Sequence, residues 1–189
     1  MNRGQRILVG LAALFMAPLA IAFLVYYGHG GSAGGKGLNH GELLSPVRPL
    51  SVHGLTFAAG GDAGGELFRR HWNLLLVASN PCDELCKQKL YDTRQVRLAL
   101  DRDMIRVQRV LLINGDCCDL AELKREHPDL VVVRAAAHND ALLAQLPGGP
   151  GDVFLIDPLS NLVMRYGKDA PAKGLLEDMK RLLKLSQIG

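Results

Sequence analysis

The segment Asn80-Pro81-Cys82-Asp83-Glu84-Leu85-Cys86 places two thiols, with three residues between them, at a predicted junction of strand and helix. The run at 72–78 that precedes it is apolar except for Asn73 and predicts a strand buried on both faces. The stretch from Asp83 to about Leu100 predicts a helix that begins on the pair. A thiol at a helix start lies near N–H groups and the positive end of the dipole, which stabilise a thiolate. Cys82 and Cys86 are therefore candidate redox thiols.

The same pair also has the character of a soft metal site. Thiolates favour Cu(I) over hard cations, so Cys82 and Cys86 are candidate copper ligands. Negative neighbours at Asp83 and Glu84 raise the pKa of a thiol but attract a cation. In a regular helix the two Cα atoms would be about 6 Å apart, which still permits a disulfide. A purely stabilising disulfide or two buried thiols are the alternatives.

A second thiol pair, Cys117-Cys118, follows a second predicted buried strand at 107–113. If the two strands are parallel, both pairs lie at the carboxyl edge of the sheet, where sites in α/β proteins gather. Cys117 and Cys118 could then help to bind the metal or exchange disulfides with the first pair. The alternative is two loop residues without a role. Four cysteines allow three intramolecular connectivities, and the sequence does not choose between them.

One histidine is placed to assist the thiols. His138 follows a third predicted strand at 130–133 and is expected on the thiol side of the sheet, as a possible metal ligand. His71 precedes the first strand, about 25 Å from Cys82 at some 3.3 Å per residue. His127 ends a predicted helix on that far side, so neither is expected to reach the thiols.

The remaining elements define the fold class. Strands alternate with helices and are followed by a predicted hairpin, 153–156 with 162–166, and a closing amphipathic helix at 171–185. This order predicts an α/β three-layer sandwich. Pro46, Pro49 and the alternation at 50–53 predict an extended entry, with an edge strand as one possibility, before the first buried strand.

The N-terminal region predicts a membrane anchor. Residues 7–27 are almost wholly apolar and uncharged, which is long enough to span a bilayer. Arg3 and Arg6 precede the span, so residues 1–6 are expected in the cytoplasm and the rest outside. A cleaved signal peptide, with a cleavage site at 31–33, is the rival interpretation.

The segments after the anchor differ in composition. Residues 28–41 are rich in glycine and predict a flexible linker, and 42–189 are expected to form one periplasmic domain. The chain has 189 residues and a formal net charge of +3, with its basic residues scattered. This pattern argues against nucleic-acid binding.

With these pieces placed, the chain resembles the Sco/SenC family, membrane-anchored proteins of thioredoxin-like fold that act in cytochrome c oxidase assembly. The resemblance rests on the anchor, on the cysteine spacing at Cys82 and Cys86, and on Asp152-Val153-Phe154-Leu155-Ile156-Asp157-Pro158, which is similar to the family's YLIDP strand and turn. Asn39-His40-Gly41-Glu42-Leu43-Leu44 is similar to a juxtamembrane stretch of oxidase-associated bacterial proteins. The resemblance implies a thioredoxin-like α/β/α sandwich and a domain held at the bacterial inner membrane.

The resemblance also implies a copper site, with one departure. Family members bind copper through the two cysteines and a histidine in the loop before the strand that matches Val153 to Ile156. Here that loop, residues 146–151, contains no histidine. Pro150 stands where thioredoxin-like folds often hold a cis-proline.

Three functions remain open on these grounds. The first is assembly of the copper site of cytochrome c oxidase through Cys82 and Cys86, with an oxidase subunit or another assembly factor as partner. The second is an enzyme, a thiol–disulfide oxidoreductase that acts on cysteines of a partner. The third is a scaffold that uses only the fold to bind the oxidase.

Overall fold

The protein is described by a computed structural model of residues 2–28, 38–135, 141–186 and 188. The chain forms two compact units, Met1–Leu38 and Asn39–Gly189. His138 lies outside the described residues.

The N-terminal unit contains one helix, α1 (Arg3–Gly28), with Pro18 inside it. Its stretch Arg3–Leu24 is long and apolar enough to cross a membrane, although a signal sequence would meet the same criterion. The predicted apolar helix is confirmed, and its composition fits a membrane anchor.

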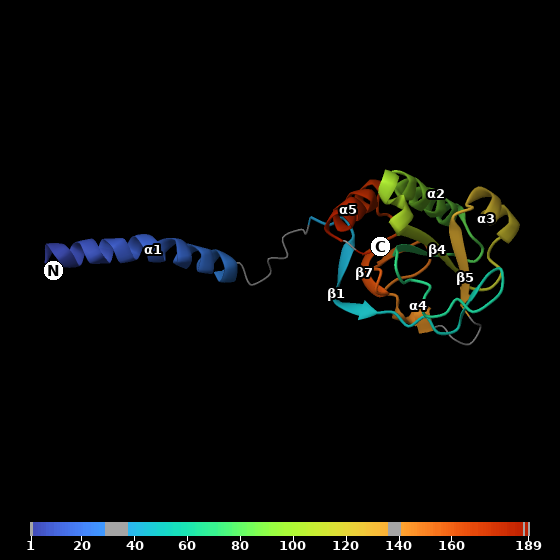
Figure 1. The fold of residues 1–189 in the computed structure, drawn as a ribbon, viewed down its shortest axis with the longest axis horizontal. Coiled ribbons are helices and arrows are strands. Elements are labelled where there is room, and N and C mark those ends of the chain that lie inside the picture. The colour runs from blue at the N-terminus through green and yellow to red at the C-terminus, as the bar shows by residue number, and fades with distance from the viewer. Residues whose placement is uncertain (1, 29–37, 136–140, 187, 189) are drawn as a thin grey trace. The chain divides into compact units, whose positions relative to one another are not determined.

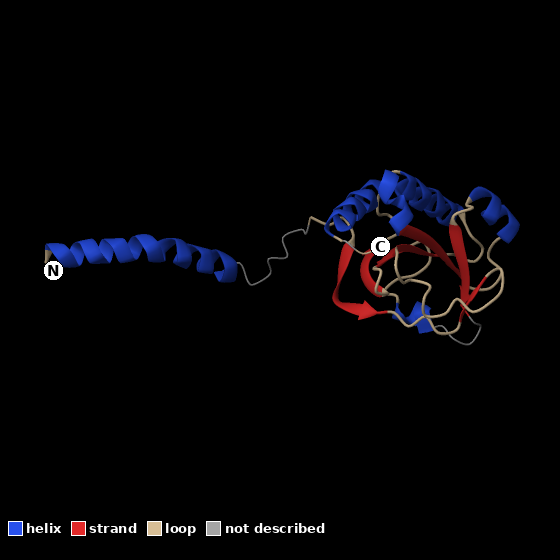
Figure 2. Ribbon diagram, in the orientation of Figure 1, coloured by secondary structure: helices blue, strands red, loops and turns tan. Residues whose placement is uncertain are grey.

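The second unit is built on a sheet of seven strands (Figure 2). In spatial order they are β1 (Glu42–Pro49), β7 (Asn161–Tyr166), β6 (Val153–Ile156), β3 (Trp72–Val77), β4 (Val107–Ile113), β5 (Leu130–Ala135) and β2 (Leu55–Phe57). The central strands β3, β4 and β5 are parallel, and the pairs β3–β6, β6–β7, β1–β7 and β2–β5 are antiparallel. All six residues of β3 are buried, Asn73 included, as the largely apolar sequence predicts for a central strand.

Helices cover both faces of this sheet (Figure 1). The helical elements are α2 (Glu84–Leu98), η1 (Asp101–Arg106), α3 (Leu120–Glu126), α4 (Ala141–Gln145) and α5 (Ala172–Leu185). Figure 1 shows α2, α3 and α5 together on one side and α4 on the other. One hydrophobic cluster joins α2, α3 and α5 to the sheet, and a second joins α4 and residues 50–68 to its opposite face. The predicted three-layer α/β/α sandwich is confirmed.

The entry to the domain differs from the sequence prediction. The edge strand β1 contains Pro46 and Pro49 of the predicted entry but ends before the alternating residues 50–53, and the short strand β2 was not predicted. Leu50 and Val52 are buried in the core cluster on the α4 side. Their alternation therefore reflects burial of a loop, which a two-residue period cannot distinguish from a strand.

The start of this entry is held to the C-terminal helix. A carboxylate oxygen of Asp178 in α5 accepts hydrogen bonds from the backbone N–H groups of His40 (2.7 Å) and Gly41 (3.0 Å) and from the hydroxyl of Tyr166 (2.9 Å). A Cβ atom at Gly41 would lie 2.6 Å from the Tyr166 ring, so only glycine fits there. The Asn-His-Gly-Glu motif at 39–42 thus has a packing role.

The position of α2 depends on a buried arginine in the sheet. Arg109 of β4 is 1% exposed and donates hydrogen bonds to the Leu90 carbonyl (2.6 Å), the Thr93 hydroxyl (3.2 Å) and the Asp129 carboxylate (3.2 Å). Burial lowers the pKa of Arg109, and the negative charge of Asp129 opposes that effect. One side chain therefore joins β4, α2 and the start of β5.

We expect Arg109→Ala to lower the free energy of unfolding by about 3 kcal/mol, since breaking a buried pair leaves polar groups without partners. The measurement is urea unfolding of the full-length protein in detergent, followed by fluorescence of Trp72, the only tryptophan of the chain. Arg69→Ala is the matched control, because the Arg69 side chain is 59% exposed. An equal, small effect of both variants would contradict the role given to Arg109.

Candidate functional site: two disulfides at one sheet edge

The parallel pairing of β3 and β4 brings the two cysteine-bearing turns to one edge of the sheet. The strands run in register from Trp72 opposite Val107 to Val77 opposite Leu112. Both chains leave the sheet on the same side, the first toward Cys82 and the second toward Cys117. The predicted juxtaposition of the thiol pairs is present in the structure.

Cys82 and Cys86 form a disulfide with their Cα atoms 5.3 Å apart. The helix α2 begins only at Glu84, with Asp83 as its N-cap, so Cys82 precedes the helix and Cys86 lies in its first turn. The predicted separation of about 6 Å assumed that both cysteines belong to a regular helix. Cys86 is 1% exposed and Cys82 is half-buried, which makes Cys82 the accessible sulfur.

The negative charge beside the pair is stabilised by hydrogen bonds. The Asp83 carboxylate accepts the backbone N–H of Cys86 (2.9 Å) and the hydroxyl of Ser79 (3.0 Å). Both hydrogen bonds hold the pKa of Asp83 below its usual value, and the one from Cys86 has the larger effect. Asp83 is therefore ionised at neutral pH, next to Cys82.

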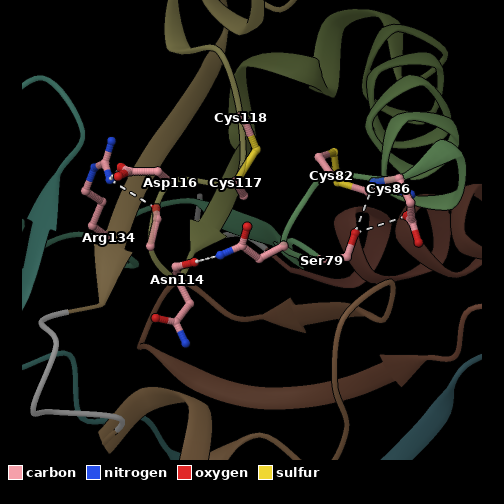
Figure 3. Close-up of a disulfide and its surroundings, with 11 residues drawn as sticks. Ser79, Cys82, Cys86, Asn114, Asp116, Cys117, Cys118 and Arg134 are labelled. Atoms are coloured by element: carbon pink, nitrogen blue, oxygen red, sulfur yellow. Dashed lines mark hydrogen bonds and ion pairs between the residues drawn. A yellow bond between two sulfur atoms is a disulfide. The ribbon is translucent and has the colours of Figure 1, made fainter.

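Cys117 and Cys118 form the second disulfide. Two hydrogen bonds join their turn to the first one. The Cys82 N–H donates to the Cys117 carbonyl (3.2 Å), and the Asn80 side chain donates to the Asn114 carbonyl (3.1 Å; Figure 3). The structure thus selects one of the three possible connectivities, with each disulfide inside its own turn.

The turn that carries the second disulfide has its own support. The Arg134 guanidinium donates to the Gly115 carbonyl and to the Asp116 carboxylate, both at 3.1 Å. Gly115 has a φ of +75°, a conformation that favours glycine. Directly after the disulfide, Asp119 caps α3 through its side chain. The turn is therefore held at both ends.

A hollow of about 720 Å³ between α2 and α3 opens onto both disulfides and is lined in part by Cys82, Cys117 and Cys118. Its walls carry both charges and an exposed tyrosine, Tyr91. The lining from α2 includes Lys87, Tyr91 and Arg94, and that from α3 includes Glu122 and Glu126. The sequence analysis missed this hollow, although the spacing of the α2 residues, i, i+4 and i+7, places them on one helix face.

His127 also lines the hollow. It is buried, and its Nδ1 atom has no hydrogen-bond partner. Burial lowers the pKa of His127, and the charges of Arg109 and Arg94 lower it further. His127 therefore contributes a neutral imidazole to a region that the sequence analysis set aside as too far from the thiols.

The loop in which the Sco/SenC family keeps a histidine lies at the same edge. The Gly151 N–H donates to the carbonyl of Val77, the last residue of β3 (3.0 Å). A Cβ atom at Gly151 would lie 3.0 Å from Leu85, inside the Cys82–Cys86 motif. The loop to which the family resemblance points for a third ligand thus reaches the Cys82–Cys86 motif, and in this chain it contains glycine and proline but no histidine. The peptide bond before Pro150 is not among the cis bonds of the described residues.

Copper fits these residues only after reduction. In the disulfide form neither Cys82 nor Cys86 offers a thiolate, and Cu(I) requires thiolate sulfur. Among the residues that the structure describes, no three histidine, cysteine or acidic side chains are grouped to hold a metal. His138 stays a prediction as a ligand.

The family of the chain follows from its sequence and agrees with the fold. A family model described as a transmembrane-like, thioredoxin-like C-terminal domain matches residues 72–186, more than half of the chain. The chain belongs to this family. The predicted thioredoxin-like fold is thereby confirmed. No curated protein matches the sequence significantly.

Solved structures of Sco proteins share the fold. Yeast Sco1 with copper bound superposes with a TM-score of 0.59 at 15% identity, over 75% of this chain and 91% of that one. Apo Sco1 from Thermus thermophilus gives 0.57 at 18%, over 76% and 96%. BsSco, described as a cytochrome c oxidase assembly protein with a disulfide switch, gives 0.56 at 12%, over 77% and 99%. The predicted Sco/SenC resemblance is confirmed at the level of the fold.

We expect Asp83→Asn to increase the reactivity of Cys82 in the reduced protein. Asparagine can still cap the helix, and loss of the adjacent negative charge lowers the pKa of the Cys82 thiol. Alkylation at pH 6–7 should then be faster by about threefold, measured by mass spectrometry.

Asp92→Asn is the matched control for this experiment. Asp92 lies on the same helix, two turns further along, and accepts a hydrogen bond from Gln88. An unchanged alkylation rate in Asp83→Asn, or an equal increase in both variants, would contradict the electrostatic role of Asp83.

Proposed function

We propose that the protein acts in assembly of the copper site of cytochrome c oxidase through the thiol pair Cys82 and Cys86. The observation that carries this proposal is the disulfide between them, at the start of α2 and the carboxyl edge of a Sco-like sheet. An oxidase subunit or another assembly factor is the proposed partner.

The unequal exposure of the two cysteines supports a different role for each. The half-buried Cys82 would react with the partner, and the buried Cys86 would then release the partner from the mixed disulfide. In the reduced protein, a Cys82 thiolate attacks a disulfide of the partner, forms a mixed disulfide and releases one partner thiolate. Cys86 then attacks Cys82, restores the internal disulfide and releases the second partner thiolate. The partner gains two electrons and a pair of thiols that can bind metal.

Copper itself would be held by the reduced Cys82 and Cys86 thiolates. Cu(I) is a soft ion that prefers thiolate ligands, and in this role it would be the cargo passed to the oxidase. The side chains do the rest: Asp83 caps the helix that carries Cys86 and adds negative charge beside the pair, which attracts a cation.

The proposed location is the bacterial inner membrane. Residues 1–6 would be cytoplasmic, 7–27 the transmembrane anchor, 28–41 the linker and 42–189 the periplasmic domain. The long apolar helix α1 supports the anchor, and Arg3 and Arg6 ahead of it support the orientation. An oxidising periplasm is also where two disulfides would persist.

A second candidate is a thiol–disulfide oxidoreductase that acts on partner cysteines without copper. The presence of two disulfides at one edge, and the absence of histidine from residues 146–151, favour it. It shares the exchange steps above but involves no copper.

For the copper role, we expect the reduced full-length protein to bind Cu(I) about tenfold or more tightly than Cys82→Ser/Cys86→Ser, because thiolates are the preferred ligands. Competition with a chromogenic Cu(I) chelator measures this affinity. Cys117→Ser/Cys118→Ser is the matched control, which should bind as the unsubstituted protein does. Equal affinity of all three proteins would overturn the copper role and leave the oxidoreductase.

For the exchange role, we expect Cys86→Ser to accumulate a mixed disulfide with a partner protein, because Cys82 can no longer be released by its neighbour. Non-reducing gels of membranes, followed by mass spectrometry, identify the trapped protein. Cys82→Ser should trap none. If a full-length variant without any cysteine restores oxidase assembly in a deletion strain, both thiol functions fail and a scaffold remains.

A further inference from the structure

We propose that Cys117–Cys118 is a second redox centre that passes electrons to Cys82–Cys86 by internal thiol–disulfide exchange. This inference rests on the proposed redox role of Cys82 and Cys86 and adds a second disulfide to it. The protein would then be a two-disulfide relay that holds four electrons when fully reduced.

The contact between the two centres is direct. The N–H of Cys82 donates to the carbonyl of Cys117 at 3.2 Å, so a backbone hydrogen bond joins one residue of each disulfide. The Asn80–Asn114 hydrogen bond, at 3.1 Å, ties the same two turns a second time. Figure 3 shows the two sulfur pairs on neighbouring turns above the ends of the strands. A thiol on one turn therefore needs only local motion to reach the other.

The two disulfides show the same pattern of burial. Each disulfide has one buried member, Cys86 at 1% and Cys117 at 7% exposure, and one half-buried member, Cys82 and Cys118. The two half-buried cysteines line the same hollow between α2 and α3. Exchange is favoured where access is greatest, so the bridge between the centres forms from Cys118 to Cys82.

Once Cys117 and Cys118 are reduced, the exchange between the two centres needs no other reactant. A Cys118 thiolate attacks the Cys82 sulfur, forms a Cys82–Cys118 disulfide and releases Cys86 as a thiolate. Cys117 then attacks Cys118, forms the Cys117–Cys118 disulfide and releases Cys82. Two electrons move from one centre to the other, and the thiol protons follow them.

An external dithiol starts the cycle. The reductant is a protein with two thiols, which attacks Cys118 from the hollow, resolves its own mixed disulfide and leaves Cys117 and Cys118 reduced. The hollow, at about 720 Å³, admits a cysteine-bearing segment of such a protein, and both centres border it. The reductant and the final partner therefore need not compete for Cys82.

A trapping experiment with the full-length protein in detergent tests this bridge. Cys86→Ser/Cys117→Ser retains only Cys82 and Cys118, and diamide oxidation should join these two in most molecules. Non-reducing digestion and mass spectrometry identify the linked peptides. The matched control, Cys82→Ser/Cys117→Ser, retains Cys118 with the buried Cys86 and should form several-fold less of the internal bond.

The outcomes separate clearly. A dominant Cys82–Cys118 bond supports the relay, whereas equal linkage in both variants, or free thiols in both, overturns it. Trp72 fluorescence must give the same unfolding midpoint for both variants, and a variant that fails this criterion is replaced by its Cys→Ala counterpart.

Oxidase assembly in a deletion strain distinguishes this inference from the proposed function. If Cys82→Ser/Cys86→Ser abolishes assembly but Cys117→Ser/Cys118→Ser leaves it at the unsubstituted level, the relay is overturned and the proposed function stands. If Cys82→Ser/Cys86→Ser leaves assembly intact, the proposed function fails whatever the trapping shows. Loss of assembly in both double variants, with Cu(I) affinity retained in Cys117→Ser/Cys118→Ser, supports the relay.

Discussion

The parallel, in-register pairing of β3 with β4 is the constraint on which the site depends. It fixes the points at which two chain segments, some thirty-five residues apart in sequence, leave the sheet. Because both leave at the carboxyl edge, the Cys82 N–H and the Cys117 carbonyl can form a hydrogen bond. A shift of either strand by one residue would turn its buried side chains to the opposite face and separate the turns.

The helix α2 is held by the sheet at its middle and by its N-cap at its start. Arg109 reaches from the sheet to the middle of α2, and Asp83 satisfies the N–H of Cys86 in its first turn. The two contacts act on different parts of the same helix, so the depth and the start of α2 are set separately. This arrangement keeps Cys86 buried while Cys82, outside the helix, stays within reach of other molecules.

The site combines a shared fold with a local chemical difference. The loop before β6 comes close to Leu85 and presents Gly151 there. What the edge adds instead is a second disulfide, Cys117–Cys118, and a hollow with charged walls. The described residues of this edge therefore offer two disulfides, and the loop before β6 offers no imidazole.

The sequence by itself determined the central strands and the candidate edge: largely apolar runs specified the strands, and the position of Cys82 and Cys86 after one of them specified the edge where the thiols lie. These features are local, because burial and helix capping leave a pattern within a few residues. Only the tertiary structure decided which cysteines pair, that β1 rather than residues 50–53 forms the edge strand, and that His127 shares a hollow with Cys82. Those outcomes depend on distances between segments remote in sequence, which no local pattern encodes.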